Sequence, residues 1–310
     1  MNNYPKIAIL LSTYNGEKFL SEQLDSLLKQ TYSNLIIVVR DDDSQDGTNL
    51  ILDDYSTRYK EKIHRIQGDK NNLGASGSFS YLVEYALRKK KRLGLTSAYL
   101  MFCDQDDIWF PEKVAIQVNE MLIAEKRIPT QPILIHSDLY VVSATNQLIA
   151  ESFIKYQGLE IKRNDFADII ISNLVTGCTA LINEELAKNA IPIPKKAIMH
   201  DWWLALLASA TGEVIFLTTP LVHYRQHGLN TIGAKKFTKG STKNRSLWQR
   251  LLSAKPNQHL REVAAQAQEF RKIHGSKLNL RKNISLLVSA LMSVNMGPFQ
   301  RVVYRIARAL

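Results

Sequence analysis

Cysteine is scarce in this chain, and so are long apolar runs. Only Cys103 and Cys178 occur in 310 residues, each inside an apolar run, which predicts two reduced, buried thiols and argues against disulfides or a zinc site. The least polar stretch, 284–299, is interrupted by polar residues, glycine and proline and is too short and too polar to cross a bilayer. No charged segment followed by an apolar one opens the sequence, so we expect no signal peptide and a cytoplasmic location.

Acidic residues are scarce in one region only. Residues 228–310 contain 16 Lys and Arg but just two acids, Glu262 and Glu269, whereas the first 227 residues contain 24 Lys and Arg and 27 Asp and Glu. A basic region beside a mildly acidic body predicts an anionic partner, either a membrane surface or a nucleic acid. A solvated helical face would carry the same charge. Because no familiar nucleic-acid motif accompanies it, we predict no nucleic-acid partner.

The first half of the chain alternates between strand and helix patterns. With 45% hydrophobic and 22% charged residues, the composition is that of an ordinary globular protein. Runs of Ile, Leu and Val at 7–11 and 35–39 predict buried strands, and leucines at helical spacing over 20–28 predict a helix between them. The alternation continues to a strand ending at Phe102 and a helix after Pro111. This order predicts an α/β fold with a mostly parallel, doubly wound sheet whose ligands bind beyond the carboxyl ends of the strands.

Beyond residue 130 the pattern becomes mixed. We predict short strands at 133–135, 139–142, 176–182, 214–217 and 221–224, and an apolar helix at 200–210. The sheet should therefore continue, with mixed direction, to about residue 227. A linker rich in Lys, Gly, Ser and Thr follows, and helical patterns resume near Leu247. These shifts predict a domain over 1–230 and a basic, mainly helical region over 231–310.

Three carboxylates follow the strand that ends near Phe102. Asp104, Asp106 and Asp107 crowd into four positions and would repel one another without a cation. Carboxylate oxygens suit Mg²⁺ or Mn²⁺, and these ions commonly bridge to phosphates. A solvated acidic turn or a helix cap before Pro111 is the alternative. The cluster favours a protein that handles a diphosphate.

Two earlier loops offer groups for a nucleotide base. The loop after the first strand, 12–16, has hydroxyls, the aromatic ring of Tyr14 and a tight turn. The loop after the second strand has Asp41 and Asp42, and a carboxylate there can accept the ring N–H of uracil or thymine, which would select a pyrimidine nucleotide. For Ser12 and Thr13 helix capping remains the alternative.

Taken together, these segments resemble a known family. Residues 11–16, 28–32, 41–48 and 104–107 resemble, in order and spacing, the family 2 glycosyltransferases of the GT-A fold, and the match covers roughly residues 5–230. The bacterial rhamnosyltransferase-like branch looks most similar, because of residues 176–179, 200–203 and 223–228.

The resemblance implies roles for residues of the donor site. Ser12, Tyr14 and Asp42 match the contacts to the pyrimidine base, with Asp42 on the ring N–H. Asp104 matches the acid near the ribose and metal. The family pattern departs at Asp43, which replaces a residue that is often glycine, and at 72–77, where no Arg or Lys offers a basic donor contact.

It also implies a metal site and a catalytic base. Asp106 matches the acid that holds the divalent ion against the diphosphate, and Asp107 either orients Asp106 or touches the donor sugar. His227, as a metal ligand, and then Arg225, as a donor contact, are the expected basic partners. Asp201 stands where the family keeps its base, although without the resemblance it reads as a helix cap.

These expectations define one function and its rivals. We predict an inverting, metal-dependent glycosyltransferase that uses dTDP-rhamnose or, second, a UDP-hexose or UDP-HexNAc, with a cell-surface polysaccharide or lipid-linked glycan as acceptor. The basic residues of 235–250, with Leu247 and Trp248 among them, would suit peripheral attachment to an anionic membrane. A catalytically silent sugar-nucleotide or glycan-binding protein and a nucleotidyltransferase are the rivals. The oligomeric state does not follow from the sequence.

Overall fold

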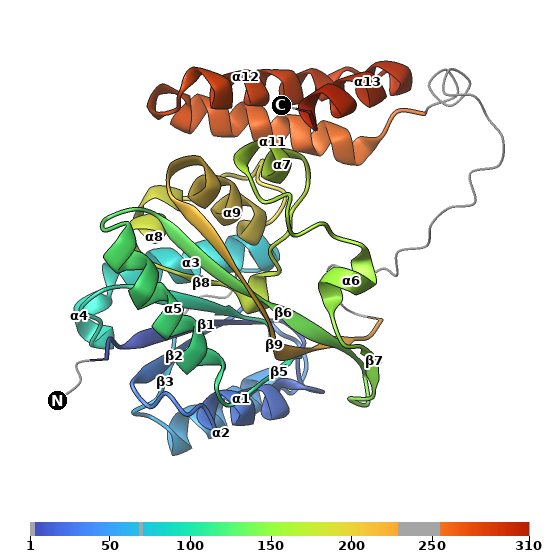
Figure 1. The fold of residues 1–310 in the computed structure, drawn as a ribbon. Coiled ribbons are helices and arrows are strands. Elements are labelled where there is room, and N and C mark those ends of the chain that lie inside the picture. Colours follow the sequence, from blue (N-terminus) through green and yellow to red (C-terminus); the bar gives the residue numbers. More distant parts are fainter. Residues whose placement is uncertain (1–3, 68–70, 229–254, 310) are drawn as a thin grey trace.

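The fold is a mixed α/β layer structure in which helices cover both faces of one sheet. A computed structural model describes residues 4–67, 71–228 and 255–309. A third layer, formed by the last three described helices, lies above the helices on one face, and the N-terminus lies on the other side of the molecule (Figure 1). The predicted α/β fold with a C-terminal helical extension is confirmed.

The described strands form one nine-stranded sheet. Its order is β3-β2-β1-β4-β8-β6-β9-β5, with β7 paired to β6. Strands β1 to β4 pair in parallel and so do β6 and β9, whereas β8, β5 and β7 pair antiparallel. The strands are β1 (Ile7–Thr13), β2 (Leu35–Asp41), β3 (Ile63–Arg65), β4 (Tyr99–Cys103), β5 (Ile108–Trp109), β6 (Ile133–Ser143), β7 (Leu148–Ala150), β8 (Leu181–Ile182) and β9 (Glu213–Gln226).

The helices follow the predicted alternation. Those of the sheet domain are α1 (Leu20–Leu28), α2 (Thr48–Arg58), α3 (Gly74–Arg88), α4 (Lys90–Leu93), α5 (Lys113–Arg127), α6 (Phe153–Gln157), α7 (Phe166–Ile171), α8 (Glu184–Ala190) and α9 (His200–Thr211). The C-terminal ones are α11 (Gln258–His274), α12 (Leu280–Ala290) and α13 (Gly297–Ala307).

Two apolar cores arise from the alternation of side chains along the strands. Ala8 and Leu10 of β1 pack with α3 and α9, whereas Ile7, Ile9 and Leu11 pack with α1, α2 and α5 on the other face. Since successive residues of a strand point to opposite faces, a continuous apolar run is what a doubly covered strand requires.

The second half of the sheet differs from the sequence prediction in its strand lengths. The segments predicted as two strands each, 133–142 and 214–224, form the single long strands β6 and β9, which run in parallel across register shifts at Ser137/Asp138 and Asp138/Tyr140. Polar residues and Pro220 interrupt the apolar pattern at this irregularity without ending the pairing. The strand predicted at 176–182 is shorter: a 3₁₀ turn, Gly177–Thr179, precedes β8.

The C-terminal helices share a core with the sheet domain. The ring of Phe270 in α11 lies 5.2 Å from Trp203 of α9 and 5.9 Å from Phe166 of α7, and Lys282 of α12 donates to the carbonyl of Ala210 at 2.6 Å. The predicted boundary near 230 and the predicted linker lie at or within 229–254, outside the described residues, as does the helix predicted from Leu247. Among the described residues, no helix combines the length and apolar character needed to cross a bilayer.

Candidate active site

The polar loops after β1, β2 and β4 meet at one edge of the sheet. Thr13 of β1 is in register with Asp41 of β2, and Leu11 is in register with Cys103 of β4. Because these three strands are parallel, the residues that follow them lie side by side. Their carboxyl ends form the crevice in which open α/β sheets bind ligands.

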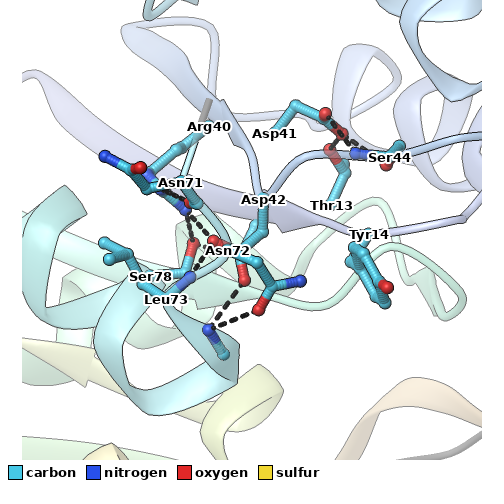
Figure 2. A network of polar contacts seen from close by, with 12 residues as sticks. Thr13, Tyr14, Arg40, Asp41, Asp42, Ser44, Asn71, Asn72, Leu73 and Ser78 are labelled. Atoms are coloured by element: carbon cyan, nitrogen blue, oxygen red, sulfur yellow. Dashed lines mark hydrogen bonds and ion pairs between the residues drawn. The ribbon is translucent and has the colours of Figure 1, made fainter. Parts of the chain in front are cut away.

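Neighbouring aspartates of the second loop have different surroundings, and their side chains point to opposite sides of it (Figure 2). Asp41 accepts hydrogen bonds from the Thr13 hydroxyl at 2.8 Å and from the Ser44 amide and hydroxyl at 2.9 and 2.6 Å. Asp41 therefore holds the loop together. Asp43 adopts a φ of 71°, a left-handed conformation that favours glycine, which is consistent with the small residue that the resemblance leads us to expect there.

Asp42 is clamped by a buried arginine and by the start of α3. Its Oδ1 pairs with the guanidinium of Arg40 and accepts the amide of Leu73 at 2.8 Å, while Oδ2 accepts the amide of Gly74 at 2.8 Å. Arg40 also donates to the hydroxyl of Ser78 at 3.0 Å and to the carbonyl of Asn71 at 2.7 Å (Figure 2). Asp42 and Arg40 are 3% and 1% exposed. Charge compensation thus comes from within the protein.

The first loop is tied to the acidic loop after β4. The amide of Tyr14 donates to Oε1 of Gln105 at 2.8 Å, and Nε2 of Gln105 donates back to the carbonyl of Tyr14 at 2.9 Å. A Cβ on Gly16 would lie 2.2 Å from that Oε1, so a larger residue there would displace the Gln105 side chain from these bonds. The Tyr14 ring is about half exposed, whereas the Ser12 hydroxyl donates to Ser78 at 2.7 Å.

The ionisation of Asp104 is affected by the carboxylates of Asp106 and Asp201. Burial, then the carboxylates of Asp106 and Asp201, raise the pKa of Asp104 to about 7. Carboxylates from the β4 loop and from α9 therefore lie close enough to repel. A divalent cation between them would relieve this repulsion.

His227 follows the end of β9 and reaches the same acids. Its Nε2 lies 2.8 Å from Oδ2 of Asp106, and its ring packs on Phe19 with centroids 4.8 Å apart. Neighbouring ligands of an octahedral ion bound at about 2.1 Å lie about 3 Å apart, so this spacing fits a shared Mg²⁺ or Mn²⁺. The predicted pair of metal residues is thus in direct contact.

Asp107 lies beneath the cleft. It is fully buried, and its Oδ1 accepts the backbone amide of Arg225 at 3.1 Å, while Oδ2 has no hydrogen-bond partner among the described residues. Ligand atoms of Asp104, Asp107 and Cys178 all lie within 4.8 Å of one another. Because burial raises the pKa of the Cys178 thiol well above its usual value, this third group stays a neutral thiol and suits Mg²⁺ or Mn²⁺ poorly. Of the two predicted roles for Asp107, orientation of its loop fits this position better than contact with the donor.

The side chain of Arg225, the predicted donor contact, binds groups of the protein itself. Its side chain is almost fully buried: Nε donates to the carbonyl of Asp106 and Nη1 to the carbonyl of Ala144, both at 3.0 Å, and Nη2 pairs with Glu22 of α1. The guanidinium therefore holds the acidic loop from behind. With His223 it lines a cavity of about 530 Å³ beside α1 and β5.

Asp201 is the second residue of α9, not its cap, since the N-cap residue is Met199. Its Oδ2 accepts the amide of Gly177 at 2.9 Å, and Oδ1 accepts the Trp202 amide at 2.6 Å and the Asn173 side-chain amide at 3.2 Å. Burial raises the pKa of Asp201 to about 6 although these bonds lower it. The result is a carboxylate that is ionised at neutral pH and is still basic enough to take a proton.

Sequence reasoning missed Arg40, Gln105, Asn173 and His200. His200 lies between the rings of Phe79 and Phe102, and burial lowers its pKa to about 3, so it is neutral. A Cβ on Gly177 would lie 2.8 Å from its Nε2. The one available signal was Arg40, because a charged residue at the end of an otherwise apolar strand requires a buried partner.

Comparison with known proteins gives this site a family. The model of glycosyl transferase family 2 matches residues 8–189. The chain is 27% identical over 233 residues to the dTDP-rhamnosyl transferase RfbG of Shigella flexneri, an alignment that covers 72% of this chain and 74% of RfbG. With other curated relatives the matched segment spans well under half of the relative, 39% in one case and 38% in another.

Solved structures share the fold. TarS 1-349 of S. aureus in complex with UDP-GlcNAc has a TM-score of 0.54 at 17% identity, over 98% of this chain and 83% of that one. The mannosyltransferase PcManGT of Pyrobaculum calidifontis, in complex with GDP-Man and Mn²⁺, has a TM-score of 0.51 at 17% identity, over 99% and 81% of the two chains. At this identity the likeness supports the GT-A fold alone.

Proposed function

The chain belongs to glycosyl transferase family 2, and from that premise we propose that it is an inverting, divalent-metal-dependent transferase with a pyrimidine nucleotide sugar as donor. dTDP-rhamnose is the first candidate, in line with the similarity to a dTDP-rhamnosyl transferase. A UDP-hexose or UDP-HexNAc is the second, in line with the fold shared with a protein crystallised with UDP-GlcNAc.

The base is proposed to bind between Tyr14 and Asp42. Asp42 is held as an ion pair and therefore only accepts hydrogen bonds, and its Oδ2 receives a single described donor, the amide of Gly74. A uracil or thymine ring N–H can fill this remaining capacity. The exposed ring of Tyr14 offers a stacking surface. Ser12 of β1 is in register with Arg40, and its hydroxyl donates to Ser78.

The diphosphate is proposed to lie against Asp104, Asp106 and His227, which would hold Mg²⁺ or Mn²⁺. Such an ion, when bound, stabilises the negative charge that grows on the departing phosphate. Two further residues of the chain would hold the acidic loop in position. Asp107 and Arg225 fix the acidic loop from below and behind through the Arg225 amide and the Asp106 carbonyl.

Asp201 is proposed as the catalytic base. It would take the proton of the acceptor hydroxyl as that oxygen attacks the anomeric carbon opposite the leaving phosphate, which inverts the configuration there. The amide of Gly177 and the side chain of Asn173 fix the direction of its carboxylate. Its raised pKa of about 6 suits a base that works near neutral pH.

One observation carries this proposal: the carboxylates of Asp106, in the β4 loop, and of Asp201, in α9, both raise the pKa of Asp104 at the sheet edge where Asp42 also lies. The acceptor is proposed to be a glycan, either in a cell-surface polysaccharide or on a lipid carrier. The predicted anionic-membrane contact through 235–250 falls outside the described residues and stays a prediction.

A thermal-shift screen of dTDP, UDP and GDP sugars, with and without Mn²⁺, tests the donor. We expect stabilisation by a dTDP or UDP sugar that depends on Mn²⁺. Stabilisation by GDP compounds alone would overturn the role of Asp42. Donor hydrolysis separates an enzyme from a silent binding protein: Asp201→Asn should keep donor binding and lower turnover by roughly 10²–10⁴-fold.

A further inference from the structure

Helix α12 has an apolar face toward solvent. Its inward side buries two serines, Ser285 and Ser289, which are 4% and 1% exposed, beside Leu286. Its outward side carries Leu280, Ile284, Leu287 and, one turn further on, Leu291, with exposed fractions of 77, 40, 46 and 48%. The spacing of 4, 3 and 4 residues places these side chains on one stripe. A surface helix of a globular protein normally has the opposite arrangement.

Helix α13 adds a second apolar stripe. Phe299, Val302 and Ile306 lie at i, i+3 and i+7 and are 38–49% exposed, whereas Val303 and Ala307 face inward. Of the 20 exposed large apolar side chains in the described residues, nine fall between Leu280 and Ile306. Single exposed apolar residues are ordinary, but such a concentration marks an interaction site. We call the exposed stripes of α12 and α13 the outer apolar surface.

This surface lies in the outermost layer of the molecule. Helices α12 and α13 lie over α11 on the side away from the sheet (Figure 1). The segment 278–309 contains five Lys and Arg and no Asp or Glu. Arg308 pairs with Glu160 at 3.3 Å, so the segment and this partner together carry a net charge of 5 − 1 = +4. An apolar face on a segment of net positive charge is complementary to a surface that is both apolar and anionic.

The same charge disfavours two other occupants. A second copy would place two such basic segments face to face, and like charges repel across an interface. The segment 229–254 of this chain has six Lys and Arg and no acid, so it too carries the same sign. A bilayer with anionic headgroups fits where these do not.

We propose that the outer apolar surface docks onto an anionic lipid bilayer, with the leucines of α12 and the apolar side chains of α13 inserted at the level of the headgroups. The docking itself does not depend on the proposed function. Its consequence for catalysis does, because α9 links the two sites: Lys282 binds the carbonyl of Ala210 near one end of α9, and Asp201 lies near the other. Nine residues of helix span roughly 14 Å. Docking would therefore hold the proposed base at a set height above lipid-linked acceptors.

Flotation of the full chain with vesicles tests the proposal. Vesicles of phosphatidylethanolamine with phosphatidylglycerol should bind the protein, and vesicles of phosphatidylcholine alone should bind it far less. Replacing three outward side chains, in Leu287→Gln/Leu291→Gln/Ile306→Gln, should lower the partition coefficient roughly five-fold for each, or on the order of a hundredfold together. Arg301→Gln/Arg305→Gln should lower binding to anionic vesicles about twentyfold and weaken its salt dependence.

Matched controls give each outcome a meaning. Ile116→Gln/Ile123→Gln removes two exposed apolar side chains of α5 and should leave binding unchanged. The proposal would be overturned if the triple variant bound vesicles as well as the unaltered protein does. Loss of vesicle binding on replacing Lys235, Lys236 and Lys239 instead would assign the binding to that segment. The proposal would also be overturned, in favour of a second copy, if the unaltered protein sedimented as a dimer, the triple variant sedimented as a monomer, and neither bound vesicles. Metal-dependent donor hydrolysis in solution should persist in every variant, which separates failure of docking from failure of the proposed enzyme.

Discussion

The two acidic loops at the sheet edge differ in how their charge is compensated. In the loop after β2, Asp42 has a buried arginine and two backbone amides, and Asp41 has hydroxyl and amide donors. In the loop after β4, the neighbours of Asp104 are other carboxylates, and burial with their charge raises its pKa to about 7. In the loop after β2, groups of the protein itself compensate the aspartate charges. The loop after β4 has the charge pattern of a site that requires a cation, and this difference leads to four predictions.

Removing an acid from the uncompensated loop should have the largest effect. Asp106→Asn removes one of two oxygens beside His227 and should lower turnover on the order of a thousandfold, because the leaving phosphate loses its counter-charge. Donor hydrolysis with Mn²⁺ measures it. Asp54→Asn, at an exposed site of α2, is the control and should keep full activity. Unchanged stabilisation by Mn²⁺ in Asp106→Asn would contradict the assignment.

Replacing Arg40, which compensates Asp42 in the loop after β2, should lower the free energy of unfolding. Arg40→Met leaves Asp42 as a buried charge without its partner, and we expect the free energy of unfolding to fall by about 3–5 kcal/mol. Arg40→Lys keeps the charge but not the two-pronged geometry and should lose less. Urea unfolding measures both. Arg127→Met removes an exposed partner of Glu213 and should cost at most about 1 kcal/mol. Equal losses in the arginine-to-methionine variants would refute the contrast.

The stability of the metal-free protein should depend on pH because of the acids Asp104 and Asp201. Because the pKa of Asp104 is raised to about 7 and that of Asp201 to about 6, the folded protein binds protons more tightly than the unfolded chain. Their stabilising effect is complete below the ordinary aspartate pKa near 4 and is lost as pH rises through 6 to 7.

Metal-free protein should therefore melt at lower temperature at pH 8 than at pH 5, and Mn²⁺ should reverse this most at pH 8. Turnover should rise over the same range as Asp201 ionises. Melting curves with chelator or Mn²⁺ and a pH–rate profile check both. A melting temperature that rises between pH 5 and 8 without metal would show that these groups are not the dominant ones.

The smallest effect concerns backbone strain in the compensated loop. Asp43 has a φ of 71°, so Asp43→Gly should raise the free energy of unfolding by about 0.5 kcal/mol. Thermal unfolding measures it. Asp54→Gly, inside α2, should have the opposite sign and a similar size, because glycine is unfavourable in a helix. A loss of stability in Asp43→Gly would mean that its side chain contributes more than its conformation costs.

Much of the fold and part of the site followed from local patterns. Continuous apolar runs predicted β1, β2 and β4 because strands covered on both faces have no polar side to show. The acids after them could be placed together because parallel strands end at one edge. The strand lengths of β6 and β9 could not be predicted, since pairing carries them across polar residues and Pro220.

The directions in which the side chains of Arg225 and Asp107 point could not be predicted from the sequence. The sequence predicted Arg225 as a donor contact, but it could not show that the guanidinium is buried, where it donates to the Asp106 carbonyl and pairs with Glu22 of α1. For Asp107, likewise, nothing local distinguished a carboxylate in the cleft from one buried beneath it.

The order of strands and helices, the acid-rich loops and the family were determined by the sequence alone, because each depends on residues close together in the chain. The tertiary structure decided which acids are neutralised, since Arg40 meets Asp42 only when β2 packs against the start of α3. It also decided that the apolar side of α12 faces outward, because the serine side is the one buried against the rest of the protein. Charge balance and exposure are set by neighbours distant in sequence, and local patterns do not contain them.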